Sequence, residues 1–255
     1  MNKIAIIIPS RLKAKRLENK PLKLINNKEM ILHVYEAATK SNSGEVYIAT
    51  PDEEIIKVVK KFGGNAIKTL DSHQTGTDRI FEVFEKVLKK EPNLIVNLQG
   101  DMPNIEPRAI SNLVNYMKKN QCDIATLASL LHPDHVYDPN VVKVFTRHIP
   151  QNKIKEAIKD STYSPVSDFH RNITTGHADY GYHHIGIYGF TNKALIKYVN
   201  LKRSKLELER DLEQMRALEN NMKIHVGYTE SSPLSVDTEE DLIEIRKIMN
   251  KNEKK

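Results

Sequence analysis

The residues Ile4–Ile8 constrain the fold more than any other part of the sequence. They are small or β-branched apolar residues with no alternation between apolar and polar positions, which is typical of a strand buried on both faces of a parallel sheet. Pro9 ends the run, and the loop that follows carries one acid, Glu18, and the cations Arg11, Lys13, Lys15, Arg16 and Lys20. Open α/β sheets bind ligands at the carboxyl ends of their strands. The loop therefore predicts an anion site, for a polyphosphate, with a solvated basic loop as the alternative.

Blocks of apolar residues then alternate between the spacing of strands and the spacing of helices. The expected strands are Glu45–Thr50, Asn65–Leu70, Leu94–Leu98 and Asp123–Leu130. The expected helices are Lys28–Lys40, one capped by Asp52, Thr77–Lys90 and Glu106–Asn120. This alternation predicts an α/β fold with a Rossmann-like, mostly parallel sheet and helices on both faces.

The pattern changes near His132. Val141–Thr146 has the composition of a strand, but residues 147–182 show no clear period, which indicates a functional lid or a flexible segment. Further strands are expected at His184–Phe190 and Lys223–Tyr228, and helices at Asn192–Asn200, at Lys205–Asn220 and after Asp237, where Thr238 and Asp241 have the spacing of a capping box. We predict one domain over residues 1–255 with a small insertion lobe at about 131–190.

Composition narrows the class of protein. A chain of 255 residues with 39% hydrophobic and 28% charged residues is typical of a soluble globular protein. No apolar run approaches the ~20 residues of a membrane helix, and the N-terminal run is too short for a secretory signal. Cys122 is the single cysteine, which excludes an internal disulfide and a cysteine-only metal site. We therefore expect a cytoplasmic protein with no membrane partner.

The net charge of +6 and the pI of about 9.1 raise the alternative of nucleic-acid binding. The lysines are scattered, however, and the sequence has no tryptophan and no aromatic-rich basic ribbon. The only dense run of lysines lies at 247–255, which we interpret as a frayed helix end. We expect no nucleic-acid partner.

Two carboxylates could hold a metal at the predicted anion site. Asp101 follows the expected strand Leu94–Leu98, so it lies at the carboxyl end of that strand. Polyphosphates normally bind with Mg²⁺, which takes one or two carboxylates together with phosphate oxygens. Asp237 is the candidate second carboxylate. Read alone, Asp101 is equally a turn former and Asp237 equally a helix N-terminal residue.

Three other short motifs could touch a ligand. The stretch Thr75–Arg79 opens an expected helix, and Gly76 there would let backbone approach a ligand closely. An ordinary N-cap is the alternative interpretation. The other two motifs are His184–Phe190 and Leu212–Arg216. His184 alone is typical of strand packing, and Glu213 and Gln214 alone are typical of a solvated helix face.

Taken in order, these motifs resemble the bacterial cytidylyltransferases for acidic sugars, and most closely the 3-deoxy-manno-octulosonate (Kdo) cytidylyltransferase family. The resemblance extends from Ile8-Pro9-Ser10-Arg11, through Gln99-Gly100-Asp101, to Val236-Asp237-Thr238. It implies a sheet of the nucleotide-diphospho-sugar transferase type and the transfer of CMP from CTP to the anomeric hydroxyl of Kdo. It also implies Mg²⁺ as the cofactor, a role in lipopolysaccharide synthesis, and a homodimer with the 131–190 lobe as the contact.

The resemblance also implies roles for individual residues. It implies that Arg11, Arg16, Lys20 and Asp101 are catalytic and that Asp101 and Asp237 bind the metal. The residues that it implies for nucleotide binding are Ser10, Arg11, Thr75, Gly76, Thr77 and Gln99. The sugar contacts are His184, Glu213 and Gln214.

The sequence departs from the family pattern at two places. Met102 stands where the family usually has an acid. After the strand that contains Val142–Val144, the family usually has an aromatic-Phe-Ser-Arg string. This sequence has only Asp160–Pro165 there, with Arg171 as a candidate substitute cation. These departures leave two alternatives open: a cytidylyltransferase for another acidic sugar, similar to sialic acid, or a non-catalytic nucleotide-binding homologue. A dinucleotide-dependent oxidoreductase is disfavoured, because no Gly-x-Gly-x-x-Gly motif follows the first strand.

Overall fold

The structure is a computed structural model that describes residues 3–13, 16–172, 180–230 and 232–252. The chain forms two compact units. The first comprises Met1–Ser111 and Pro233–Lys255, and the second comprises Asn112–Ser232. The predicted lobe at 131–190 falls within the second unit. Within the described residues, no helix is both long enough and apolar enough to span a membrane.

The first unit is built on four parallel strands in the order β5-β4-β1-β6. Their bounds are Ile4–Pro9 for β1, Glu45–Thr50 for β4, Ala66–Lys68 for β5 and Leu94–Leu98 for β6. Every residue of β1 and of β6 is buried, as the uninterrupted apolar run predicted. Because the strands are parallel, their carboxyl ends lie at one edge of the sheet.

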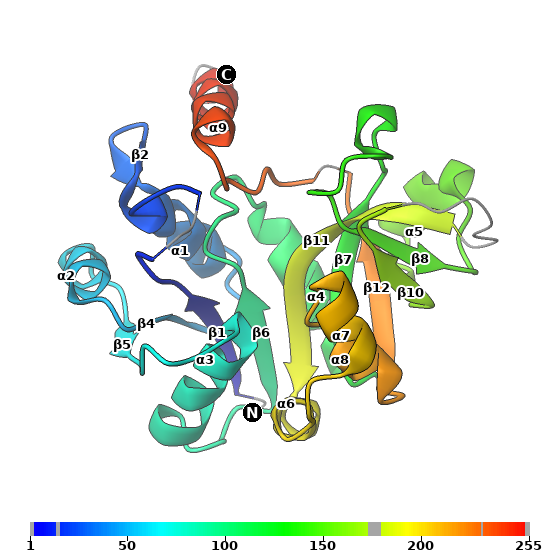
Figure 1. Cartoon of the computed structure of the whole chain (residues 1–255), viewed down its shortest axis with the longest axis horizontal. Helices are drawn as coiled ribbons and strands as arrows, with labels where there is room; N and C mark the ends of the chain where they lie inside the picture. The colour runs from blue at the N-terminus through cyan, green and yellow to red at the C-terminus, as the bar shows by residue number, and fades with distance from the viewer. Residues whose placement is uncertain (1–2, 14–15, 173–179, 231, 253–255) are drawn as a thin grey trace. The chain divides into compact units, whose positions relative to one another are not determined.

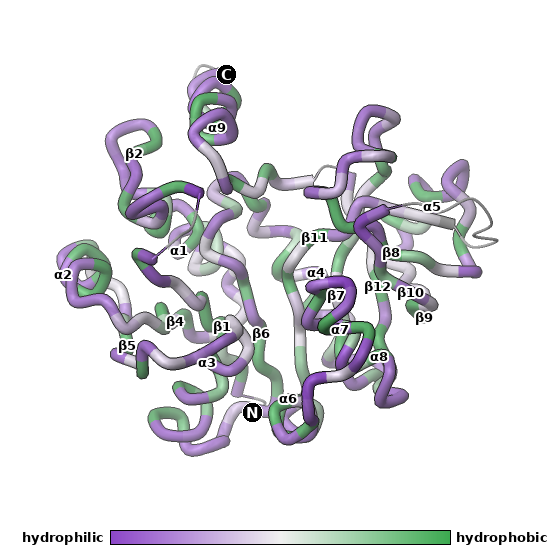
Figure 2. The backbone as a smooth tube through the Cα atoms, viewed as in Figure 1, coloured by the Kyte–Doolittle hydropathy of each residue, from purple (hydrophilic) through white to green (hydrophobic). Residues whose placement is uncertain are grey.

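Helices cover both faces of these strands. The covering helices are α1 (Met30–Lys40), α2 (Glu53–Lys61) and α3 (Gly76–Glu82, continued by a π-helical turn at Val83–Val87). Two further helices are α9 (Glu239–Asn252), which packs beside β2, and α4 (Pro107–Lys119), which leads into the second unit. Right-handed crossovers place α1 and α2 on one face and α3 on the other, as Figure 1 shows. The predicted fold class, a mostly parallel sheet with helices on both faces, is confirmed. In Figure 2 the hydrophobic colour follows β6, and hydrophilic residues dominate the outer side of α2.

A small apolar cluster fixes the loop after β1 to the segment before α9. Between the cationic loop and α1, the chain forms a 3₁₀ turn, Lys20–Leu22, and a two-stranded ribbon of β2 (Leu24–Ile25) and β3 (Lys28–Glu29). The buried members of the cluster are Leu17, Ile25, Met30, Val236, Leu242 and Ile245. Leu17 adjoins Arg16, and Val236 adjoins Asp237. Burial of this cluster therefore holds a predicted cation and a predicted carboxylate in place.

Asp52 anchors the start of the cationic loop with its side chain. Asp52 is the N-cap residue of α2, as predicted, but its side chain makes no capping hydrogen bond. One carboxylate oxygen, Oδ2, accepts a hydrogen bond from the backbone N–H of Leu12 at 2.7 Å. Loop amides have few partners within the loop itself, so this bond holds the backbone just after Arg11.

The second unit has strands β7 (Ile124–Ser129), β8 (Lys143–Thr146), β9 (Tyr163–Pro165), β10 (Asp168–His170), β11 (Tyr180–Thr191) and β12 (Ile224–Tyr228). β7 pairs with β12 in parallel and with β11 antiparallel. β8 pairs antiparallel with β10 and β11, and β9 pairs antiparallel with β12. The helices are α5 (Ile154–Lys159), α6 (Asn192–Val199), α7 (Lys205–Arg210) and α8 (Met215–Glu219), with 3₁₀ turns at Pro133–His135 and Gln151–Lys153.

Residues 147–182, predicted to be a functional lid or a flexible segment, contain regular structure among the residues that the structure describes, while 173–179 lie outside them. The segment contains α5, β9 and β10, and β11 begins within it. These elements are three to six residues long apart from β11. Such short elements have too few residues to show a period in the sequence.

The predicted single helix Lys205–Asn220 is two helices. Asp211, at the end of α7, has a left-handed backbone with φ of 51°, which no helix interior adopts. At the start of α7, Glu207 Oε2 accepts a hydrogen bond from the backbone N–H of the N-cap residue, Ser204, at 3.1 Å. Glu207, with a fully buried side chain, accepts hydrogen bonds from Arg203 and from Arg216 of α8. This buried ion pair ties the two helices together across the break.

We expect Asp52→Ala to speed amide exchange at Leu12 about tenfold or more. A hydrogen bond from an N–H to a carboxylate contributes about 1.5–3 kcal/mol, and local exchange follows the free energy of opening. Hydrogen–deuterium exchange resolved by NMR measures the change. Asp71→Ala is the matched control, since Asp71 pairs with the exposed Lys13 of the same loop. Equal acceleration in both variants would contradict the anchoring role.

We expect Glu207→Gln to lower the free energy of unfolding by about 3 kcal/mol, because it removes the carboxylate that pairs with the buried guanidinium of Arg216. Urea unfolding at pH 7 measures the loss. Burial alone would raise the pKa of Glu207, but hydrogen bonds from Arg216 and Arg203 lower it. The wild-type advantage should therefore be complete above the ordinary pKa of 4.5 and disappear as the pH falls through the lower folded value.

Glu209→Gln is the control on the same helix. Glu209 is about half exposed and pairs with Lys205 at 3.6 Å, so its loss should cost less than about 0.5 kcal/mol. A loss at Glu207 as small as the loss at Glu209 would show that the buried pair contributes little to holding α7 against α8.

Candidate functional site

A pocket of about 400 Å³ lies in the first unit at the carboxyl ends of its strands. The cationic loop, the loop after β5, the end of β6 and the segment before α9 line it. Of the predicted residues, the lining includes Ser10, Arg11, Arg16, Lys20, Thr75, Gly76, Gln99, Asp101 and Asp237. The fold thus brings together in one pocket all but one of the residues predicted for catalysis, nucleotide binding and metal binding.

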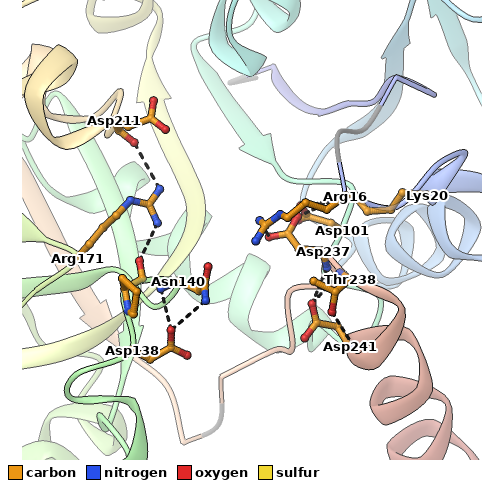
Figure 3. A network of polar contacts seen from close by, with 11 residues as sticks. Arg16, Lys20, Asp101, Asp138, Asn140, Arg171, Asp211, Asp237, Thr238 and Asp241 are labelled. Carbon is orange, nitrogen blue, oxygen red and sulfur yellow. Dashed lines mark hydrogen bonds and ion pairs between the residues drawn. The ribbon is translucent and has the colours of Figure 1, made fainter.

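Asp101 and Asp237 converge on one ammonium group. Lys20 Nζ donates to Asp101 Oδ2 at 2.9 Å and to Asp237 Oδ1 at 3.0 Å. Arg16 Nη2 lies 2.9 Å from the other oxygen of Asp237. Figure 3 shows the four side chains meeting. Burial alone would lower the pKa of Lys20, but the two carboxylates outweigh it and the pKa is raised, so the ammonium stays charged between them.

Backbone contacts hold the two carboxylates together although 136 positions (237 − 101) separate them in the sequence. The N–H of Val236 donates to the carbonyl of Asp101 at 2.9 Å. Thr238 and Asp241 form the predicted capping box, with bonds of 3.2 and 2.9 Å, and Asp241 Oδ2 also accepts from the N–H of Asp237 (Figure 3). The start of α9 is thereby fixed against the end of β6.

This donor set suits Mg²⁺. Two carboxylate oxygens already share one cation, and Mg²⁺ takes one or two carboxylates with the remaining ligands from phosphate and water. Among the residues that the structure describes, no three His, Cys, Asp or Glu side chains form a metal site. The pair alone is thus an incomplete site, which a polyphosphate would complete. The residues present fit the metal that the sequence predicts.

The loop after β5 forms another wall of the pocket. Thr75 caps α3 by accepting from the N–H of Asp78 at 3.1 Å. A Cβ on Gly76 would lie 3.2 Å from the Pro9 ring and 3.6 Å from Gln99 Nε2, so only glycine fits there without displacing neighbours. Thr77 is not part of the lining. Its side chain is 2% exposed and its hydroxyl accepts from Asn97 Nδ2 at 3.2 Å, so its role in nucleotide binding stays a prediction.

Sequence reasoning missed two polar residues of the lining, His73 and Gln74, and gave no individual role to Lys13 and Arg79, which lie within the predicted motifs. His73 Nε2 lies 2.6 Å from Glu82 Oε2, which also accepts from the N–H of Leu70. Burial alone would raise the pKa of Glu82, but these bonds and one from Lys86 lower it to about 2. The signal that could have found His73 is its place at the carboxyl end of a parallel strand.

Arg79 is a buried cation in the same wall. Its Nη1 donates to Thr69 Oγ1 at 2.6 Å and to the Leu70 carbonyl at 2.9 Å. Burial and the nearby Arg11 lower its pKa. Together with Arg11, it gives the pocket positive charge that an anionic ligand would neutralise.

The predicted sugar contacts lie in the second unit. His184 on β11 is buried, and its Nε2 lies 3.0 Å from Thr126 Oγ1. The Thr126 hydroxyl donates to the Ile187 carbonyl at 2.8 Å, so Nε2 of His184 donates to Thr126 and Nδ1 is left as the acceptor. Burial lowers the pKa of His184 to about 3. A neutral acceptor suits a ligand hydroxyl.

Glu213 and Gln214 lie between α7 and α8 rather than within one helix. The Tyr198 hydroxyl donates to the Glu213 carbonyl at 2.8 Å, and the buried Gln214 is the N-cap residue of α8. They are therefore not on a solvated helix face. Because the helix is interrupted at Asp211, Glu213 and Gln214 lie in the turn between α7 and α8.

Arg171 belongs to a second polar network. Its guanidinium donates to the carbonyls of Pro139 at 3.2 Å and Asp211 at 3.4 Å (Figure 3). The fully buried Lys143 donates to the carbonyls of Arg171 and Asp138, both at 2.6 Å. Burial lowers the pKa of Lys143. The network thus joins the strand that contains Lys143 to the turn before Glu213.

The missing Phe-Ser-Arg string has a counterpart. β10 pairs with β8 and contains Phe169 and His170, directly before Arg171. Phenylalanine and arginine thus have the spacing of the family string, with histidine in place of serine. Asp160–Pro165 is not this counterpart, because α5 and β9 lie between β8 and β10 and place the phenylalanine and the arginine farther along the chain. Arg171 occupies the expected place in the order of the chain, and its role stays a prediction.

Comparisons with known proteins agree with this geometry. The family model described as cytidylyltransferase matches residues 5–224. The 3-deoxy-manno-octulosonate cytidylyltransferase of Bartonella tribocorum is 39% identical over 246 residues, covering 96% of this chain and 97% of that protein. The protein of the same name from Thermodesulfovibrio yellowstonii is 40% identical over 253 residues, covering 96% and 97%.

A solved structure supports the same grouping. The CMP:2-keto-3-deoxy-manno-octonic acid synthetase complexed with CTP has a TM-score of 0.85 and 32% identity, and the match covers 98% of this chain and 100% of that one. The likeness confirms the predicted sheet of the nucleotidyltransferase type. On its sequence, its pocket and its fold, this chain belongs to the cytidylyltransferase family, in the group formed by the 3-deoxy-manno-octulosonate cytidylyltransferases.

Proposed function

We propose that this protein transfers CMP from CTP to the anomeric hydroxyl of Kdo and releases pyrophosphate. The observation that carries the proposal is the convergence of Asp101 and Asp237 in a cation-lined pocket. Family membership at about 40% identity over nearly the whole chain supports both CTP and Kdo as substrates. The product, CMP-Kdo, would supply lipopolysaccharide synthesis.

The chain's own residues act by position and charge. The anomeric oxygen forms a bond to the α-phosphorus of CTP, and the bond from that phosphorus to the β-phosphate oxygen breaks. Arg11, Arg16 and Lys20 line the pocket and would bind the β- and γ-phosphates and the leaving pyrophosphate. Ser10, Thr75, Gly76 and Gln99 would hold the nucleoside. Aligning the reacting atoms and stabilising developing charge account for most of the rate in such reactions.

Asp101 and Asp237 would hold Mg²⁺. Bound there, the ion supplies positive charge to the phosphate oxygens at which negative charge grows. The carboxylates also set where that charge lies, because both are fixed by the contact between Val236 and the Asp101 carbonyl. No nucleophilic side chain is needed.

The sugar contacts remain His184, Glu213 and Gln214. The neutral Nδ1 of His184 can accept from a sugar hydroxyl, and a carboxylate at Glu213 can accept from two. Arg171 offers a cation that complements an acidic sugar, and its order in the chain matches the family string. A cation at Arg171 favours an acidic sugar such as Kdo over a neutral sugar. Sialic acid, a second acidic sugar, is therefore the comparison substrate.

We also propose that the protein is a cytoplasmic homodimer with a contact in the 131–190 lobe. The family resemblance carries this proposal. Light scattering after size-exclusion chromatography measures the mass in solution, and a value of 29.2 kDa, that of one chain, would contradict it.

The first measurement is pyrophosphate release from CTP and Mg²⁺, alone, with Kdo and with sialic acid. We expect release that requires Kdo. Release with sialic acid alone would keep the mechanism and change the acceptor. Measurable CTP binding without release with either sugar would favour the non-catalytic nucleotide-binding alternative.

We expect Asp101→Asn to lower turnover by about 10²–10³ or more, because one aimed charge at a reacting phosphate typically contributes that much. Steady-state pyrophosphate release measures the rate, and circular dichroism confirms that the variant folds. Asp71→Asn is the control, since Asp71 is an exposed carboxylate in the loop after β5 that pairs with Lys13 rather than with the metal pair. Full activity of Asp101→Asn with Mg²⁺ present would refute the metal assignment.

A further inference from the structure

Lys20 and a metal ion would compete for one position. Lys20 Nζ lies within 3.0 Å of an oxygen from each carboxylate. Mg²⁺ binds such oxygens at about 2.0–2.1 Å in near-ideal octahedral geometry. An ammonium at hydrogen-bond distance from both oxygens occupies the point from which a metal would coordinate them. The two cations therefore exclude each other at this pair.

The pair is also electrically balanced without a metal. Arg16 takes the remaining oxygen of Asp237 at 2.9 Å, so two cations face two carboxylates. Lys20 is the more enclosed of the two cations, with a side chain 16% exposed against 53% for Arg16. A divalent ion gains little from carboxylates whose charge is already neutralised, and it would have to displace Lys20 into a pocket lined by other cations.

A polyphosphate changes this balance. Lys20 and Arg16 line the same pocket as Arg11 and Lys13, and the lysine ammonium is mobile on a four-carbon stem. Phosphate oxygens entering the pocket offer Lys20 a new anionic partner, while they also supply the remaining ligands of a metal. Both effects favour binding of the metal to Asp101 and Asp237.

We propose that Lys20 holds Asp101 and Asp237 together in the free protein and excludes divalent metal from them. When nucleotide binds, Lys20 moves to the phosphates, so that metal enters only with nucleotide. This inference rests on the proposed function for the nucleotide and on the fit of the pair to Mg²⁺ for the metal. Metal and nucleotide binding are then positively coupled, and the coupling is reciprocal.

The first test uses metal alone, so it does not depend on the proposed function. Mn²⁺ binding to the free full-length protein is measured by electron paramagnetic resonance at 0.15 M salt. We expect weak binding to the wild type and an affinity at least about tenfold higher in Lys20→Met, within the range of such couplings. Lys20→Arg keeps the charge and should stay close to the wild type.

Lys13→Met is the matched control, because it removes the same charge from the same pocket, where Lys13 pairs with Asp71 rather than with the metal pair. Its effect should stay below about threefold, the size of a screened surface interaction. Asp101→Asn in the Lys20→Met background should abolish the gain. Thermal unfolding monitors whether Lys20→Met folds. An affinity in Lys20→Met no higher than in Lys13→Met would overturn the proposal.

The second test follows Lys20 itself. With lysine labelled at Cε, NMR should show a Lys20 signal that Mg²⁺ alone leaves in place and that CTP with Mg²⁺ shifts. The Lys20→Arg variant identifies the signal by its loss. A shift of equal size with Mg²⁺ alone would overturn the proposal. If pyrophosphate release fails but the Mn²⁺ result holds, the proposed reaction is wrong and the role of Lys20 stands.

Discussion

β1 is hydrogen-bonded on both edges, in parallel with β4 and with β6, and the rest of the first unit depends on that pairing. Parallel pairing requires crossovers, and the crossovers carry α1, α2 and α3 onto the two faces. It also brings the ends of β1, β5 and β6 to one edge. The loops that leave those ends carry the cations, Gly76 and Asp101, so the pocket follows from the direction of the strands.

Electrostatics then shape what the pocket can hold. Among the residues that the structure describes, its walls bring Arg11, Lys13, Arg16, Lys20 and Arg79 together with two acids, Asp101 and Asp237. These positive charges repel one another, but carboxylates of the same chain neutralise part of them. Lys20 pairs with Asp101, Arg16 pairs with Asp237, and Lys13 pairs with Asp71. The protein keeps its cations ordered through contacts within the chain, which a polyanion can replace. Preformed, satisfied donors need less rearrangement than loose ones when a ligand binds.

The sequence predicted the parallel core well, because continuous apolar runs such as Ile4–Ile8 and Leu94–Leu98 have one physical interpretation. It predicted the second unit less well. Short elements such as β9 and β10 carry no period, and the break at Asp211 depends on a left-handed residue inside a run of good helix formers. The meeting of Asp101 with Asp237 could not be derived from spacing at all, since a backbone bond between distant segments creates it. There the family resemblance supplied what local physics could not.

The position of Asp237 in the chain has a consequence for synthesis. The first unit is discontinuous: its β-strands come from Met1–Ser111, whereas the second carboxylate and α9 come from Pro233–Lys255. A nascent chain on the ribosome can therefore pair β1, β4, β5 and β6 long before residue 237 has been made. Until then Lys20 lacks Asp237 as a carboxylate partner, and Leu17 and Ile25 lack the apolar partners that Val236 and α9 supply. The ligand site is thus among the last parts of the protein to form, after the second unit has been translated.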